Sequence, residues 1–174
     1  MSNLHLPNLP LILTLKLDQT TFERFNEWRQ QYFPPAKNFL PAHVTLFHKL
    51  PSEQETAIHQ TLQHFCEGTS ILSLHFPTLR SLGQGVAIEI QSSELIELRK
   101  QLARGWSDWL STQDRQGYRP HITIQNKVSV GEAQQVYQQL MSQWNPSDGY
   151  GEGLLLWRYE GGPWTLIHEF LFKV

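Results

Sequence analysis

Two short segments of the chain repeat the same order of residue types. One reads HVTL from His43 and the other reads HITI from His121, so each has a histidine and a threonine separated by one apolar residue. Side chains two positions apart on a β-strand point to the same face. If both segments are strands, His43 and Thr45 face a cleft on one of them, and His121 and Thr123 face it on the other. The apolar residues would then anchor each strand in the core.

Two imidazoles and two hydroxyls around one cleft suit a displacement at the phosphorus of a phosphodiester. A neutral histidine can take the proton of the attacking oxygen and a protonated one can protonate the leaving oxygen, because both titrate near pH 7. Threonine hydroxyls can donate hydrogen bonds to the nonbridging oxygens, where negative charge develops. The residues therefore predict acid–base chemistry by His43 and His121 without a metal or other cofactor. The near-symmetry of the segments leaves the two roles open.

The sequence around these segments predicts the elements that position them. Alternating apolar residues predict strands over residues 11–17, 42–50, 71–76, 86–90, 120–126, 153–159 and 164–172, the last two as a hairpin after a loop at 145–151. Apolar residues three and four apart predict helices over residues 20–33, 52–68, 93–110 and 129–144. Asp18 can cap the first helix. Ser52 with Glu55, and Ser129 with Glu132, are typical of capping boxes.

The order strand–helix–strand–helix–strand occurs twice, and His43 and His121 stand about 78 residues apart. This order predicts an internal duplication with repeats at roughly 10–80 and 85–174 inside a single domain spanning residues 1–174. The predicted fold class is α+β with α/β-type lobes: a bilobal molecule of two pseudo-symmetric sheet-plus-helix halves around a central cleft. The alternative is one α+β domain whose halves are similar by coincidence.

The paired HxTx segments in a duplicated chain resemble the 2H phosphoesterase superfamily, which includes 2′-5′ RNA ligases and cyclic phosphodiesterases. The stretches HVTLFHKLP and HITIQNKV are most similar to a bacterial branch that is 2′-5′ RNA ligase-like. The resemblance implies that His43 and His121 are catalytic and that Thr45 and Thr123 bind the phosphate. It implies hydrolysis of an RNA or nucleotide 2′,3′-cyclic phosphate to a 2′-phosphate, or reversible 2′-5′ joining. RNA ligases tend to carry an arginine shortly after the second segment, where this chain reads QNK.

Residues next to the two segments are further candidates for substrate binding. Regular alternation places Phe47 and Gln125 on the cleft face, where Phe47 could stack on a base or fill the core and Gln125 could bind a base or ribose. The same alternation puts His48 on the opposite face as a structural residue. Lys127 could steer a phosphate or stand in solvent, and Arg119 could bind a flanking phosphate.

The composition limits the partners. A net charge of −2 and a pI near 6.4 exclude a broadly basic nucleic-acid or membrane binder. Among the substrates that the resemblance implies, the charge favours a small nucleotide or an RNA terminus over extended RNA. The single cysteine, Cys66, excludes an intrachain disulfide. The N-terminus has no positively charged segment or cleavage site typical of a signal peptide, so we expect a cytoplasmic protein. We also expect a monomer that does not engage a membrane.

Three alternatives stay open at this point. A metal hydrolase would use histidine ligands, although each segment offers only one good ligand. An ATP-independent 2′-5′ RNA ligase would use the same residues to join ends. A non-catalytic module would bind an RNA end or a nucleotide without turnover.

Overall fold

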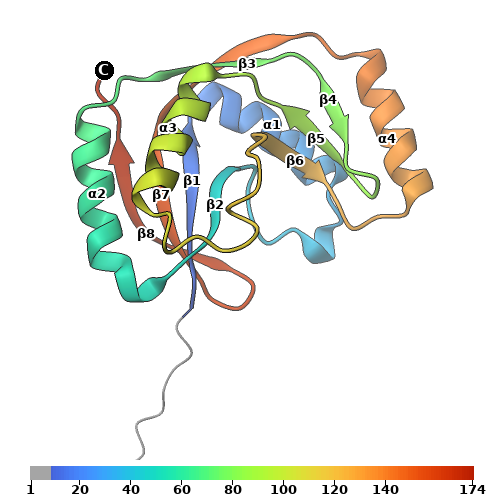
Figure 1. The fold of residues 1–174 in the computed structure, drawn as a ribbon. Helices are drawn as coiled ribbons and strands as arrows, with labels where there is room; N and C mark the ends of the chain where they lie inside the picture. Colours follow the sequence, from blue (N-terminus) through green and yellow to red (C-terminus); the bar gives the residue numbers. More distant parts are fainter. Residues whose placement is uncertain (1–8) are drawn as a thin grey trace, which may run out of the picture.

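The computed structural model describes residues 9–174 (Figure 1). Part of the N-terminal stretch used for the signal-peptide prediction lies outside these described residues. The strands are β1 (Leu11–Leu17), β2 (Val44–Leu50), β3 (Leu72–Phe76), β4 (Leu79–Ser81), β5 (Val86–Glu89), β6 (His121–Gln125), β7 (Ser147–Tyr159) and β8 (Trp164–Leu171). The α-helices are α1 (Gln19–Tyr32), α2 (Glu55–Glu67), α3 (Ser93–Gly105) and α4 (Val130–Ser142), with 3-10 turns at Pro35–Lys37 and Ser52–Gln54.

Side-chain caps set where several helices begin. The Asp18 carboxylate accepts a hydrogen bond from a backbone N–H in the first turn of α1, and the Ser129 hydroxyl does the same for α4. Ser92 caps α3. The predicted capping box at Ser52 is wrong, because Ser52 opens a 3-10 turn and α2 starts three residues later at Glu55 without a side-chain cap.

Some predicted boundaries are also wrong. The helix predicted over 93–110 ends at Gly105, and most of the loop predicted over 145–151 is the first part of β7. This part of β7 pairs with β3. Its glycines and polar residues give no strand signal, so the pairing is a tertiary effect that the local pattern does not contain.

The strands form two sheets in which every paired strand is antiparallel. One sheet has the order β2-β1-β7-β3 with β8 paired to β7, and the other has the order β4-β5-β6. The α+β prediction is therefore confirmed. The sheets do not coincide with the predicted repeats at 10–80 and 85–174, because β7 and β8 join the sheet of β1–β3 and β4 joins that of β5 and β6.

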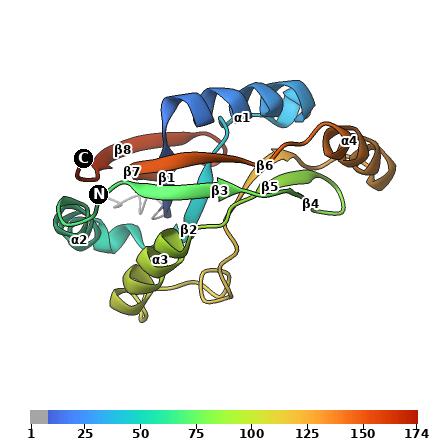
Figure 2. The same cartoon turned by 90° about the horizontal axis from the view of Figure 1, so that it is seen from above.

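The helices cover the sheets in a similarly exchanged way. Helix α1 packs against β6 and α4 against β4 and β5, whereas α2 packs against β7 and β8 and α3 against β3. Seen from above, α1 lies on one side of the sheet layer and α2 and α3 on the other (Figure 2). Each half of the chain thus supplies one helix to the sheet that holds the other half's HxTx segment.

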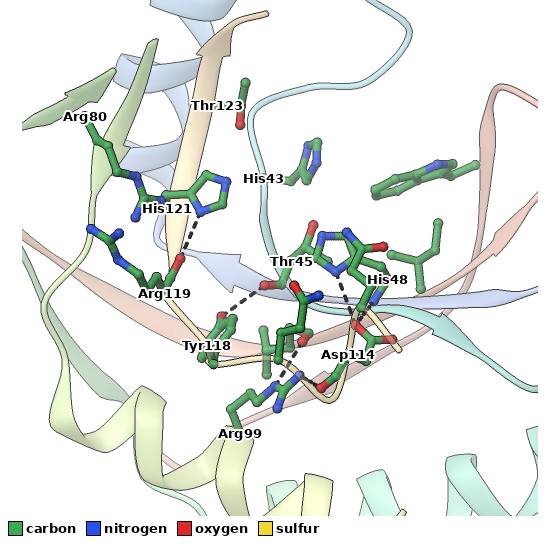
Figure 3. Close-up of a pocket in the computed structure, with 16 residues that line it drawn as sticks. His43, Thr45, His48, Arg80, Arg99, Asp114, Tyr118, Arg119, His121 and Thr123 are labelled. Atoms are coloured by element: carbon green, nitrogen blue, oxygen red, sulfur yellow. Dashed lines mark hydrogen bonds and ion pairs between the residues drawn. The ribbon is translucent and has the colours of Figure 1, made fainter. Parts of the chain in front are cut away.

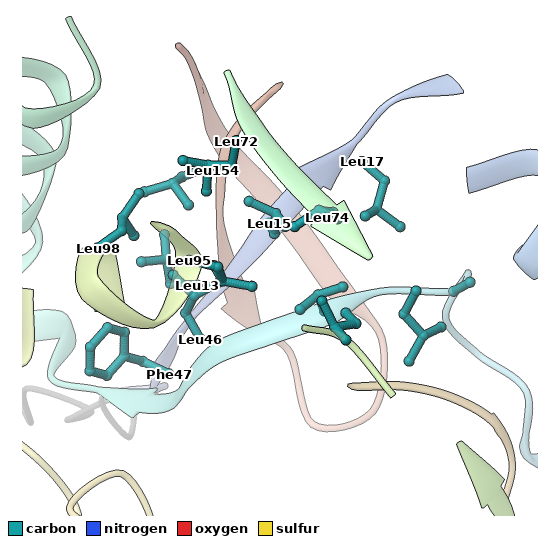
Figure 4. Packing of buried hydrophobic residues seen from close by; sticks show 14 of the residues in the cluster. Leu13, Leu15, Leu17, Leu46, Phe47, Leu72, Leu74, Leu95, Leu98 and Leu154 are labelled. Carbon is teal, nitrogen blue, oxygen red and sulfur yellow. The ribbon is translucent and has the colours of Figure 1, made fainter. Parts of the chain in front are cut away.

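One cluster of buried apolar side chains runs through both sheets. It contains Leu13 and Leu46 of the larger sheet, Ile88 and Ile122 of the smaller one, and Leu95 of α3. Figure 4 shows the part of this cluster between α3 and the larger sheet. The cluster holds β2 and β6 in one rigid body of packed side chains. No helix in residues 9–174 is long and apolar enough to cross a membrane.

Strand β2 carries a β-bulge directly after its threonine. Thr45 pairs with Thr14 and Phe47 pairs with Leu13, so two steps on β2 correspond to one step on β1. A bulge of this kind turns the following side chains to the other face. Leu46 and Phe47 are consequently both buried, and the alternation that held up to Thr45 is broken.

Strand β6 carries the equivalent bulge. Thr123 pairs with Ala87 and Gln125 pairs with Val86, so the extra residue again follows the threonine. Gly85 lies against this bulge, and a Cβ atom there would sit 2.0 Å from the Gln125 carbonyl oxygen. The close approach requires glycine at that position.

Candidate active site

The two HxTx segments meet at one pocket of about 370 Å³ (Figure 3). The pocket brings together His43, Thr45, His121 and Thr123, as the repeat predicted. Its lining consists of Ile12, His43, Thr45, Leu46, His48, Arg80, Arg99, Gln113, Asp114, Gln116, Gly117, Tyr118, Arg119, His121, Thr123 and Trp164. The volume lies in the range of small-molecule sites. Arg119, predicted as a substrate-binding residue, is among the lining residues.

The imidazole rings of the two segments are held in the same way. His43 Nδ1 lies 2.8 Å from the carbonyl oxygen of Pro41, and His121 Nδ1 lies 2.9 Å from the carbonyl oxygen of Arg119. A carbonyl oxygen only accepts, so Nδ1 carries the hydrogen in each ring. The Nε2 atoms are therefore the ones left to exchange a proton with a ligand in the pocket.

Burial disfavours the charged form of both rings. It lowers the pKa of His43 to about 4, and the positive charges of Arg29, His121 and His48 act in the same direction. Burial also lowers the pKa of His121, with contributions from nearby cations. Both histidines line the same pocket, so one bound anion can lie beside both rings.

Donors from other parts of the chain fix the open edges of both motif strands. β2 and β6 lie at sheet edges, so one side of each backbone has no strand partner. Arg29 of α1 donates from Nη1 to the Thr123 carbonyl at 2.8 Å, and Arg99 of α3 donates from Nε to the Leu46 carbonyl at 3.2 Å. Tyr118 Oη donates to the carbonyl of residue 45 at 3.0 Å. Each half therefore positions the segment of the other.

Phe47 and Gln125 do not face the pocket, and the prediction that they do was wrong. Both are buried, because the bulges after Thr45 and Thr123 turn them toward the core. Phe47 packs edge-on against Trp106, with ring centroids 5.2 Å apart. The Gln125 Oε1 atom is buried without a hydrogen-bond partner in the described residues.

Lys127 also stays outside the pocket. Its side chain is exposed, and its backbone has a φ of 62° just after β6 ends. The Lys127 carbonyl accepts a hydrogen bond from Lys37 Nζ at 3.2 Å. The structure therefore places this lysine in the turn after the strand and not among the residues that line the pocket.

His48 is a pocket residue that the alternation missed. The bulge returns it to the pocket side, where its Nδ1 lies 3.2 Å from Oδ1 of Asp114. Asp114 is buried and also accepts hydrogen bonds from the backbone N–H groups of His48 and Lys49. Burial acts to raise the pKa of Asp114, but these hydrogen bonds outweigh it and lower the pKa. A carboxylate thus orients a third imidazole beside the other two.

Two further lining residues, Trp164 and Arg80, were not predicted. The Trp164 ring meets the His43 ring edge-on with centroids 5.0 Å apart. Arg80 lies beside His121 (Figure 3). Neither has a sequence signal, because each comes to the pocket from a strand distant in the chain.

No group of three or more His, Cys, Asp and Glu side chains in residues 9–174 is arranged to hold a metal ion. In His43 and in His121, Nδ1 is hydrogen-bonded to a backbone carbonyl. In His48, Nδ1 is bound to the Asp114 carboxylate. This arrangement favours proton transfer at the outward nitrogens.

The fold and pocket define an α+β protein built around two edge strands that each present a histidine and a threonine. A model of the 2′-5′ RNA ligase superfamily matches residues 17–163, and the chain belongs to this superfamily. The resemblance to the 2H phosphoesterases is thereby confirmed. The superfamily comprises phosphoesterases and RNA ligases, and this supports the prediction that the protein is an enzyme. No curated protein matches the chain.

Solved structures share the fold. TT0787 of Thermus thermophilus is 14% identical with a TM-score of 0.66, and the match covers 94% of this chain and 98% of that one. E. coli LigT complexed with 3′-AMP is 18% identical with a TM-score of 0.63, covering 96% and 99%. A structure described as a phosphoesterase is 17% identical with a TM-score of 0.63 and the same coverage. At these identities the likeness concerns the fold.

Proposed function

We propose that the protein is a metal-independent phosphoesterase that opens a 2′,3′-cyclic phosphate, on an RNA end or a small nucleotide, and leaves a 2′-phosphate. One observation carries the proposal: His43, His121, Thr45 and Thr123 line a single pocket with both Nδ1 atoms bound to backbone carbonyls. Membership of the superfamily supports this chemistry, and the LigT structures with 3′-AMP and with phosphate support a phosphorylated nucleotide as ligand.

In the proposed reaction a water oxygen attacks phosphorus in line with the ribose 3′ oxygen. The Nε2 atom of one imidazole takes a proton from the water as the new P–O bond forms. The bond between phosphorus and the 3′ oxygen breaks, and the Nε2 atom of the other imidazole gives its proton to that oxygen. Proton exchange with solvent then restores both rings. The hydroxyls of Thr45 and Thr123 donate hydrogen bonds to the nonbridging oxygens.

The lowered pKa values of His43 and His121 fit this scheme. The lowered pKa values favour the neutral form of both rings in the free protein at pH 7, so either can act as base. A phosphodiester anion between them favours the charged form of an imidazole. Substrate binding therefore allows one ring to hold the proton that the leaving oxygen requires.

The superfamily also favours a second candidate, ATP-independent 2′-5′ joining of RNA ends. A ribose hydroxyl would replace water as the attacking group, and the same two proton transfers would occur. The two activities share all four residues and differ only in the nucleophile.

The test incubates the purified protein with nucleoside 2′,3′-cyclic phosphates in excess chelator, beside His43→Ala and His121→Ala. We expect turnover that persists in chelator and falls by about 10²–10⁴-fold in each variant, the usual contribution of one acid or base. Loss of activity in chelator would indicate a metal hydrolase. Affinity without turnover would indicate a binding module, and joining of added 5′-hydroxyl ends would identify a ligase.

A further inference from the structure

A pair of arginines beside His121 is not used by the two-histidine chemistry. Arg80 comes from β4 and Arg119 from the segment directly before β6, and both line the pocket (Figure 3). Arg119 Nη2 lies 3.2 Å from Glu89 Oε1, and Arg80 Nη1 lies 3.9 Å from the same oxygen. One carboxylate on β5 is therefore shared by two guanidinium groups, and the cluster keeps an excess positive charge.

The Arg80 side chain is incompletely satisfied. It is only 17% exposed, and within residues 9–174 its buried Nε has no hydrogen-bond partner. Burial lowers the pKa of Arg80, and the like charge of Arg119 adds to this effect. Burying an unpaired donor of a charged group costs more free energy than burying an unpaired donor of a neutral group. Two like charges at close range also repel each other. An anion beside these arginines would relieve both costs.

The surroundings of the two histidines differ in charge. Among the lining residues, the indole of Trp164 lies beside His43, whereas Arg80 and Arg119 lie beside His121. Arg29, whose charge also acts on His43, does not line the pocket. The Arg119 side chain is 73% exposed, so it remains free to reorient toward a ligand. Guanidinium groups match the geometry of phosphate oxygens and can bind them in a bidentate manner.

We infer that Arg80 and Arg119 form a subsite for a second phosphate group, located on the His121 side of the phosphate that reacts. This inference rests on the proposed function and narrows its substrate class. The preferred substrate carries a phosphate on its 5′ oxygen in addition to the terminal cyclic phosphate. Both a 5′-monophosphorylated nucleotide and an RNA terminus, through its last internucleotide diester, present this group.

The experiment measures binding by titration calorimetry, so it does not depend on turnover. The probes are adenosine 2′-phosphate, adenosine 2′,5′-bisphosphate, and a diadenosine with a 3′-5′ diester and a terminal 2′-phosphate. We expect the wild-type protein to bind one or both of the last two about tenfold or more tightly than the first, as for a charge-assisted contact. A preference for the diester probe alone would assign the subsite to RNA ends, and one for the bisphosphate alone to 5′-phosphorylated nucleotides.

Single substitutions connect the preference to the arginines. Arg80→Gln and Arg119→Gln should each bring the affinity ratio between the phosphorylated and simple probes close to one, whereas Arg80→Lys should keep part of it. Arg104→Gln, which removes one exposed cation from the end of α3, is the matched control and should keep the full ratio.

Two results would overturn the subsite. One is equal wild-type affinity for all three probes. The other is a proportionate loss of affinity for every probe in Arg80→Gln and Arg119→Gln, which would mean that the arginines bind the reacting phosphate itself. Failure of the proposed function is distinct, since it would appear as absence of turnover with cyclic phosphates whatever the affinity ratio.

Discussion

Strands β2 and β6 are alike up to their bulges and differ around them. In both, the histidine Nδ1 binds the carbonyl two residues earlier, and the bulge follows the threonine. After its bulge β2 continues and presents His48 to the pocket, whereas β6 ends at Gln125 and the chain turns away. Two residues before the histidine, Pro41 precedes β2 and Arg119 precedes β6.

The difference separates two tasks. The features that the strands share are those that proton transfer to and from one phosphorus centre would require. The features that differ, His48 on one side and Arg119 on the other, stand where the remainder of a substrate would contact the pocket. Two strands with matched geometry can thus keep the chemistry symmetric while the surrounding residues become specific for one ligand.

After the two histidines, the largest effect should come from the symmetric pair of threonine hydroxyls. Thr45→Val and Thr123→Val should each lower kcat by about 10²–10³-fold, because each removes one donor to a charged oxygen. Thr→Ser at either position keeps the hydroxyl and should retain most of the activity. Steady-state kinetics on a 2′,3′-cyclic phosphate make the comparison. A loss confined to one threonine would contradict the equivalence of the strands.

Phe47→Ala should act on stability. Phe47 is fully buried beneath the Arg99 guanidinium, 4.3 Å from its ring centroid, so truncation leaves a cavity in the core. We expect a loss of about 3–5 kcal/mol in the free energy of unfolding, measured by urea denaturation. Phe47→Leu should recover most of it. A raised KM at unchanged stability would instead restore Phe47 as a base-stacking residue.

His48→Gln tests the feature that β2 has and β6 lacks. We expect KM to rise about fivefold, the equivalent of one hydrogen bond, with a smaller change in kcat. The matched control is His75→Gln, because His75 also pairs with a carboxylate, at 2.6 Å from Asp148, but lies outside this pocket. Identical kinetics for the two variants would remove His48 from substrate binding.

Gln125→Met should have the smallest effect. The Gln125 Oε1 atom is buried without a partner in the described part of the chain, so an apolar side chain of similar size removes a buried acceptor that has no compensating hydrogen bond. We expect the free energy of unfolding to stay within about 1 kcal/mol of the wild-type value or to increase. A large loss would show that Gln125 has a partner in solution.

The sequence predicted the central four residues because strand periodicity is local. Two identical HxTx patterns needed only the rule that alternate side chains share a face, and this rule holds up to Thr45 and Thr123. The alternation rule fails at Phe47, Gln125 and His48, because a bulge adds one residue to each strand. The residue types in these strands give no signal that predicts the bulge.

The residues that line the pocket or hold its strands divide into those with a sequence signal and those without one. Arg99 lies on the apolar stripe of α3 between Leu95 and Leu102, and Arg29 lies on that of α1, so a cation at a buried position marked both as having a specific partner. Asp114 and Arg80 come from a loop and a short strand that carry no periodicity. Only the folded chain brings them to the pocket.

The pH dependence of kcat/KM for a 2′,3′-cyclic phosphate tests the central claim most directly, when measured for the wild-type protein, His43→Ala and His121→Ala. One imidazole must be neutral and the other charged, so the wild-type profile should be bell-shaped. Burial lowers the pKa values of both histidines. The midpoint of each limb should therefore lie at a pH below the ordinary histidine pKa of about 6.5. Each variant should lose one limb. A wild-type rate that rises steadily to high pH, or limbs that survive in both variants, would contradict catalysis by these two histidines.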